Sequence, residues 1–185
     1  MGVVKVRFNL LVSTQRGREN DCISELWYLL REIGDENAVY RKTGIPGLVI
    51  AKTKLNPFEA VRRLMEIAEE RPWEFRYVLK VTPIEVTTET DIEKIKEAVK
   101  PLIQKICEDE TFRITVNKRA STLRSRDIIR EVASLIDRKV DLNKPDKIVQ
   151  IEVLGKYTGI SILKRDDILS IAKVREEFLN RMRRT

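Results

Sequence analysis

The sequence predicts an α+β fold of two-layer α/β architecture, divided into two domains at residues 1–87 and 88–185. Apolar residues alternate with polar ones in several short segments, which is typical of half-buried strands, and recur at helical spacing in the segments between them. The chain has 185 residues, of which 42% are apolar and 35% charged, so it can bury one core or two small ones.

The first domain is predicted to contain four strands and two helices. A strand runs from Val4 to Val12, a helix from about residue 20 to 33 ends before Gly34, and residues 38–43 and 48–53 form a hairpin. A second helix starts at Asn56-Pro57, where the asparagine can cap it and Glu59 can reach back, and a strand covers residues 75–81. The order strand, helix, two strands, helix, strand predicts a split βαβ, or ferredoxin-like, arrangement.

Two details of this domain bear on packing and function. The first helix is expected to bury one apolar face, made by Ile23, Leu26, Trp27, Leu30 and Ile33. Arg16 and Arg18 lie in the loop before this helix, and a helix N-terminus is a common place for a phosphate to bind. The alternative, which we favour from the sequence, is an ordinary turn between strand and helix.

The second domain is expected to start near Thr88 with a helix that Pro101 kinks or ends after Val99. Residues 112–119 form a strand, and residues 125–136 a helix whose apolar face comprises Ile128, Ile129, Val132, Leu135 and Ile136. A turn at residues 139–146 precedes strands at 148–154 and 157–164. A last helix presents Ile171, Val174, Phe178 and Met182 on one face.

Positive charge gathers in the second domain. The net charge of the chain is +7, yet residues 1–109 contain 18 Lys+Arg and 18 Asp+Glu, so the excess lies in residues 110–185. Five cations stand between residues 118 and 130 with one anion, Asp127: Lys118, Arg119, Arg124, Arg126 and Arg130. Such a patch favours a polyanionic partner, the alternative being a solvated charged face.

The composition also excludes several kinds of site. The chain has no histidine, which removes Ser-His, Cys-His and His-metal sites, and it has neither a G-x-G-x-x-G nor a Walker loop. We therefore expect no catalytic residue, no metal and no cofactor. Cys22 and Cys107 are expected to be buried apolar thiols. Without an apolar run long enough for a bilayer or a signal pattern, a cytoplasmic location is expected.

The stretch Phe112–Arg119, the helix after it, the segment Lys139-Val-Asp-Leu-Asn-Lys-Pro-Asp146 and the last two strands resemble a THUMP domain. This is an RNA-binding module of tRNA-modifying proteins, and the first half resembles the domain that usually precedes it. With residues 13–18 and 157–167 included, the chain is most similar to the stand-alone THUMP proteins that partner the tRNA cytidine acetyltransferase.

This resemblance implies that the chain is not an enzyme. Its two domains would hold the acceptor stem and 3′ end of tRNA for a separate acetyltransferase, through Lys118, Arg119, Arg124, Arg126 and Arg130, with Arg16 and Arg18 in the first domain. Because the chain ends soon after its last strand, we expect no fused catalytic domain. Two alternatives stay open: an RNA-modifying enzyme, in which Asp166 and Asp167 could act, and an RNA-binding subunit of another split enzyme.

Overall fold

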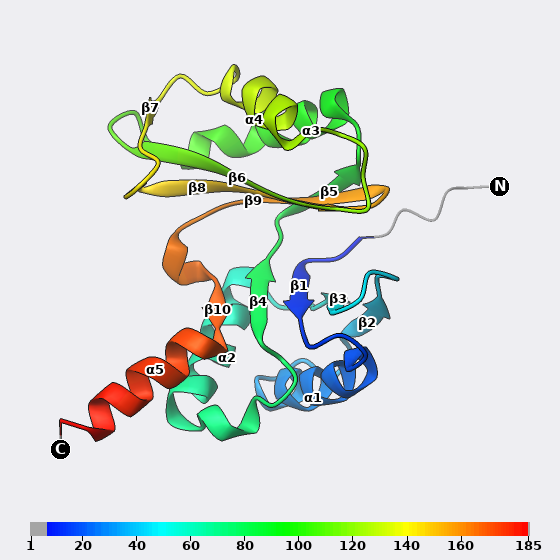
Figure 1. Ribbon diagram of the computed structural model, residues 1–185, viewed down its shortest axis with the longest axis vertical. Helices are drawn as coiled ribbons and strands as arrows, with labels where there is room; N and C mark the ends of the chain where they lie inside the picture. Colours follow the sequence, from blue (N-terminus) through cyan, green and yellow to red (C-terminus); the bar gives the residue numbers. More distant parts are fainter. Residues whose placement is uncertain (1–6, 185) are drawn as a thin grey trace. The chain divides into compact units, whose positions relative to one another are not determined.

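The computed structural model describes residues 7–184, which divide into two compact units (Figure 1). The first unit comprises residues 8–83 together with residues 166–184, and the second unit comprises residues 84–165 together with Arg7. Val4 and Val6 of the expected first strand lie outside the described residues. Among the described residues, no helix combines the length and the apolar character that crossing a membrane requires.

The first unit has the predicted ferredoxin-like order. It runs β1 (Leu10–Ser13), α1 (Glu19–Glu32), β2 (Val39–Lys42), β3 (Leu48–Lys52), α2 (Pro57–Glu70), a 3₁₀ turn (Pro72–Glu74) and β4 (Lys80–Pro83). β1 lies between β3 and β4, antiparallel to both, in a sheet of order β10-β4-β1-β3-β2. The position of β3 between β1 and β2 is what splits the βαβ unit.

The start of α2 confirms the predicted helix cap. The Asn56 side-chain oxygen accepts hydrogen bonds from the backbone N–H groups of Phe58 (3.0 Å) and Glu59 (3.3 Å), and Pro57 is the first helical residue. The Glu59 carboxylate does not reach back to the cap, because it binds the guanidinium groups of Arg62 and Arg63 instead.

Two expectations for the first unit are wrong. Trp27 is 45% exposed, with the Arg31 guanidinium 4.6 Å from the centre of its ring, and Leu29 is buried in its place. Strand β4 starts at Lys80, whereas the sequence predicted a strand that starts at residue 75. The Glu25 carboxylate accepts the backbone N–H groups of residues 76–78, so these groups make no strand ladder.

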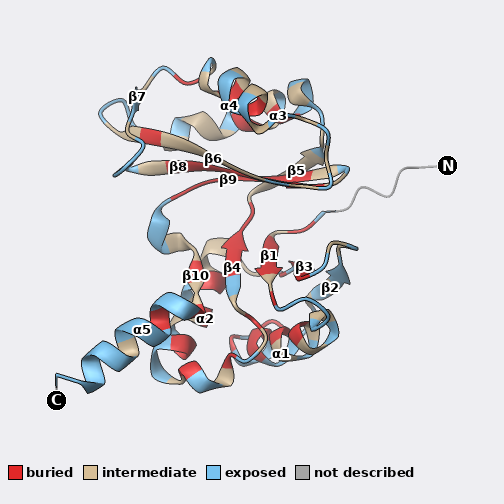
Figure 2. Cartoon of the chain, in the orientation of Figure 1, coloured by how far each residue is buried: buried red, intermediate tan, exposed pale blue. Residues whose placement is uncertain are grey.

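The C-terminal segment belongs to the first unit, whereas the sequence-based division assigned it to the second domain. β10 (Leu169–Ser170) pairs antiparallel with β4, and α5 (Ile171–Met182) buries Ile171 and Val174 in the core that α1 and α2 share. The expected apolar face of α5 is buried only in its first half, since Met182 is 64% exposed (Figure 2).

The second unit is a five-stranded mixed sheet with helices on one face. It comprises β5 (Val86–Glu89), α3 (Ile92–Val99), a 3₁₀ helix (Lys100–Lys105), β6 (Thr111–Arg119), α4 (Ser125–Ala133), β7 (Lys139–Val140), β8 (Lys147–Leu154) and β9 (Tyr157–Leu163). The strand order is β5-β9-β8-β6-β7, and β6 runs parallel to β8. The end of α3 at Val99 confirms the predicted break before Pro101.

The two cysteines differ. Cys22 is fully buried in α1, and burial raises the pKa of its thiol to about 12. Cys107 is exposed in the loop before β6, so the expectation of a buried thiol in a helix is wrong for this residue.

One residue of the apolar face predicted for α4, Ile129, is exposed in the structure. Ile128 and Val132, four residues apart, are 1% and 0% exposed, while Ile129 is 38% exposed. Ile129 lies about 100° around the helix from Ile128, which puts it at the edge of the buried stripe.

Replacing Ile128 by alanine is therefore expected to lower the free energy of unfolding by about 2–4 kcal/mol, because a fully buried side chain leaves a cavity. Ile129→Ala should cost less than about 1 kcal/mol, because this side chain is partly in contact with solvent and its removal leaves no closed cavity. Urea unfolding of both variants measures this difference. Equal losses would mean that the buried face of α4 is assigned incorrectly.

Candidate nucleic-acid interface

The five cations from the sequence lie at the end of β6, at the residue before α4 and along α4. Lys118 and Arg119 are the last residues of β6, Arg124 is the residue that precedes α4, Arg126 lies in the first turn of α4, and Arg130 lies in its last turn. We call these five residues the basic junction. Between strand and helix the chain turns at Ala120, whose φ of 52° lies in the left-handed region that residues with a side chain rarely adopt. The carbonyl of Arg119 accepts a hydrogen bond from the Gly155 N–H at 2.9 Å, which fixes the strand end to the β8–β9 turn.

Arg119 differs from the other four cations, because it is bound to a buried carboxylate. Its Nη1 lies 2.5 Å from Oε2 of Glu152, which stands on the neighbouring strand β8 and is 1% exposed. The other Glu152 oxygen accepts hydrogen bonds from the side chains of Asn117 (2.9 Å) and Gln150 (2.8 Å). Arg119 thus compensates a buried charge and supports the end of β6.

Glu152 was missed by the sequence reasoning. A signal was present in the sequence, since Glu152 stands between the apolar residues Ile151 and Val153 of the strand, and a charged residue in a buried strand needs a partner. The identity of that partner depends on the pairing of β6 with β8, where Asn117 stands opposite Glu152.

The remaining cations of the basic junction face solvent. Lys118, Arg124 and Arg126 are exposed, as is Arg130, which lies 3.3 Å from Asp127 and 3.8 Å from Glu131. Ion pairs at such exposed positions contribute about 0–1 kcal/mol and exchange readily for other partners. The four side chains can therefore contact an anionic surface without leaving a buried carboxylate unpaired.

Arg16 and Arg18 are exposed in the first unit, in the loop before α1. Arg18 precedes the helix and pairs with Asp21 at 3.2 Å. The Glu19 carboxylate accepts the backbone N–H groups of Gly47 (2.6 Å) and Gly17 (3.2 Å), and the Gly47 bond most strongly lowers the pKa of Glu19. The chain's own carboxylate thus occupies N–H groups that a phosphate would use, and this favours the ordinary-turn interpretation for the loop backbone.

The turn before β8 holds the other end of β6. The Asp146 carboxylate accepts hydrogen bonds from the backbone N–H (2.8 Å) and hydroxyl (3.0 Å) of Thr111, the first residue of β6. Asp141 accepts the N–H groups of Asn143 and Lys144, and the Arg113 side chain donates to the Leu142 carbonyl. This segment is structural, because the Asp141 carboxylate is bound within the turn and the Asp146 carboxylate is bound to the start of β6.

The second unit is expected to lose stability in acid through Asp146. The Thr111 N–H lowers the pKa of Asp146, so the fold prefers the charged carboxylate. That contribution is present above the unfolded pKa and is lost as the pH falls below about 4. Urea unfolding across this range should therefore give a shallower pH dependence for Asp146→Asn than for the unchanged chain. The exposed-site control Asp109→Asn should follow the unchanged chain, and identical curves for all three proteins would contradict the assignment.

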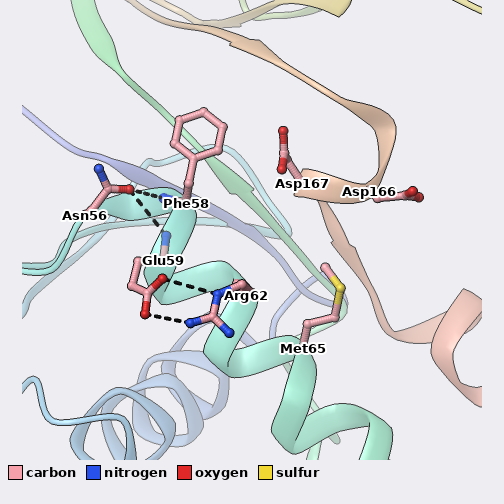
Figure 3. A pocket seen from close by; sticks show the side chains of 7 residues that line it. All are labelled: Asn56, Phe58, Glu59, Arg62, Met65, Asp166 and Asp167. Carbon is pink, nitrogen blue, oxygen red and sulfur yellow. Dashed lines mark hydrogen bonds and ion pairs between the residues drawn. The ribbon is translucent and has the colours of Figure 1, made fainter. Parts of the chain in front are cut away.

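Asp166 and Asp167, the residues considered for an enzymatic alternative, do not form a catalytic pair in the structure. Their carboxylates point in different directions (Figure 3), and Asp166 lies 3.3 Å from Lys173. Nor do they cap α5, because Ser170 precedes that helix.

Comparisons with known proteins agree with this architecture. The family model of the THUMP domain matches residues 89–163. "Uncharacterized protein MJ0421" of Methanocaldococcus jannaschii is 31% identical over 158 residues, which cover 82% of this chain and 40% of that protein. The chain thus spans less than half the length of the curated relative that it matches.

Solved structures share the fold at low sequence identity. PH1313 from Pyrococcus horikoshii Ot3 has a TM-score of 0.60 and 19% identity, over 85% of this chain and 54% of that chain. A 4-thiouridine synthetase, solved as an RNA complex with bound ATP, has a TM-score of 0.53 and 15% identity, over 89% of this chain and 42% of that chain. The region that the THUMP family model matches runs from the end of β5 to the end of β9 and includes the whole basic junction. Residues 89–163 therefore form a THUMP domain.

Proposed function

We propose that the chain is a non-catalytic adaptor that binds the acceptor stem and 3′ end of tRNA and presents it to a separate cytidine acetyltransferase. The observation that carries the proposal is the group of exposed cations Lys118, Arg124, Arg126 and Arg130, which lie at the end of one strand and along the following helix of a THUMP domain. Lysine and arginine at such positions can follow a phosphate backbone, and arginine planes can stack on unpaired bases.

The residues of the expected interface have different roles in this proposal. The four exposed cations contact RNA directly, through charge and shape more than through base sequence. Arg119 acts as a positioning residue, since its guanidinium is bound to Glu152 and holds the strand end that carries Lys118. Arg16 and Arg18 orient the RNA end from the first unit.

Two further observations support a role in tRNA modification. THUMP domains are RNA-binding modules of tRNA-modifying proteins, and the 4-thiouridine synthetase with the same fold was solved as an RNA complex. The choice of an acetyltransferase rests on the resemblance of residues 13–18 and 157–167 to the stand-alone THUMP proteins.

Reconstitution with purified components tests the adaptor role. We expect acetylcytidine in tRNA only when the chain, acetyl-CoA and the acetyltransferase of the source organism are combined, and no product from the chain alone. Modification of tRNA by the chain alone, with acetyl-CoA or S-adenosylmethionine, would show that it is an enzyme. Affinity capture of a different catalytic subunit would assign the chain to another split enzyme.

The double variant Arg16→Ala/Arg18→Ala separates binding from presentation. We expect tRNA binding to weaken only a few-fold, because these two exposed arginines add to the contacts of the basic junction. Acetylation in the reconstituted reaction should fall much further, because the RNA end is no longer oriented. Normal acetylation by this variant would mean that the loop is an ordinary turn and that Arg16 and Arg18 do not orient the RNA end.

A further inference from the structure

The first unit contains a groove that the RNA interface does not use. It consists of two adjoining concavities of about 630 and 370 Å³, which share Met65 and Asp166 in their linings. One wall is the outer side of α2, and the other is the segment that leads through β10 into α5 (Figure 3). The larger concavity is in the range of ligand and side-chain binding pockets.

The floor of the groove is apolar. Phe58, Met65 and Ile168 line it and are half-buried, so part of each side chain is accessible from the groove. Methionine is unbranched and polarizable, and it adapts to partners of different shape. An apolar floor of this kind can receive aliphatic side chains of a bound segment.

The rim of the groove is acidic, in a chain whose net charge is +7. Five carboxylates line it against two cations, Arg62 and Lys173; the carboxylates are Glu59, Glu69, Asp166, Asp167 and Glu177. Arg62 pairs with Glu59 and Glu66, and Lys173 pairs with Asp166, at exposed positions where ion pairs exchange readily for other partners. The groove therefore presents net negative charge.

The negative charge of the groove favours a basic protein segment over a nucleic acid as its occupant. A nucleic-acid backbone would meet like charge here, whereas the basic junction of the second unit offers it opposite charge. Opposite potentials across an interface guide association and exclude wrong partners. An apolar floor with an acidic rim fits a protein segment that carries both aliphatic and cationic side chains.

We propose that the groove between α2 and α5 is the docking site for a basic, amphipathic helical segment of a partner protein. The aliphatic side chains of that segment lie on Phe58, Met65 and Ile168, and its lysine or arginine side chains pair with Asp166, Asp167 and Glu69. The inference goes beyond the proposed function and does not depend on RNA binding, because the residues that line the groove include none of the expected RNA contacts.

Peptide binding to the full chain tests this site. The probe is a fluorescent helical peptide with leucine on one face and lysine and arginine on the other, and a second peptide carries glutamate in place of the cations. We expect the basic peptide to bind and the acidic one not to bind. Asp166→Asn/Asp167→Asn should weaken binding of the basic peptide about tenfold, which corresponds to about 1.4 kcal/mol.

A matched control removes two exposed acids from the second unit, as Glu108→Gln/Asp109→Asn, and should bind the basic peptide as the unchanged chain does. Thermal melts and tRNA titrations accompany each variant, and both should be unchanged. The proposal is overturned if the groove variant binds the basic peptide normally, if the acidic peptide binds equally well, or if the groove variant loses affinity for tRNA. Failure of tRNA binding in the unchanged chain would contradict the adaptor role and leave the peptide result intact.

Discussion

Replacing Arg119 by alanine is expected to lower the free energy of unfolding by about 2–4 kcal/mol, because it leaves the buried Glu152 carboxylate without its ionic partner. Asn117 and Gln150 still donate to one oxygen of Glu152, but neither carries a compensating charge. Chemical unfolding of the unchanged chain and of Arg119→Ala measures the loss. A parallel loss of tRNA affinity would then be secondary to the disturbed end of β6.

Two controls test whether the loss of stability comes from the Arg119–Glu152 ion pair. Lys118→Ala changes the adjacent exposed cation and should alter stability by less than about 0.5 kcal/mol. Adding Glu152→Gln to Arg119→Ala should recover part of the loss, since the buried charge is then removed, and the double-mutant cycle isolates the pair. If Arg119→Ala is as stable as Lys118→Ala, Arg119 belongs with the exposed cations and its role as a support for β6 is wrong.

The double variant Arg124→Ala/Arg126→Ala is expected to weaken tRNA binding by about 30- to 100-fold, or about 2–3 kcal/mol, because two charge-assisted contacts are lost. Both side chains are exposed and off the buried stripe of α4, so the thermal midpoint should stay unchanged. A tRNA titration at fixed salt measures the affinity.

The matched control for this variant is Arg41→Ala/Lys42→Ala, which removes the same charge from exposed positions of β2 in the first unit. It should affect affinity several-fold less, because those residues lie outside the basic junction. Equal losses in the two double variants would indicate a response to net charge alone.

The sequence predicted those parts of the fold that local patterns determine. The period of two in residues 112–119 and the helical spacing after Ser125 placed the strand end and helix start of the basic junction. Asn56-Pro57 and Pro101 marked a helix start and a helix end, because an N-cap side chain and a missing N–H act locally.

The predictions were wrong where packing between distant segments determines which residues are buried and which unit a segment joins. Trp27 and Ile129 lie at the edges of apolar stripes, and periodicity does not tell which side of a stripe faces the sheet. The assignment of α5 to the first unit depends on the pairing of Leu169 and Ser170 with β4, and a two-residue strand has no pattern of its own. The Arg119–Glu152 pair depends on the parallel pairing of β6 with β8, which also lies beyond local sequence.

The salt dependence of tRNA binding is the most direct test of the claim that the basic junction contacts the phosphate backbone. Each phosphate contact contributes a slope of roughly −0.7 to −0.9 to a plot of log affinity against log salt concentration. We expect a steep slope for the unchanged chain and a slope shallower by about 1.5 for Arg124→Ala/Arg126→Ala, because two contacts are lost. A flat response of the unchanged chain, or the same slope for both proteins, would contradict the assignment of tRNA binding to these residues.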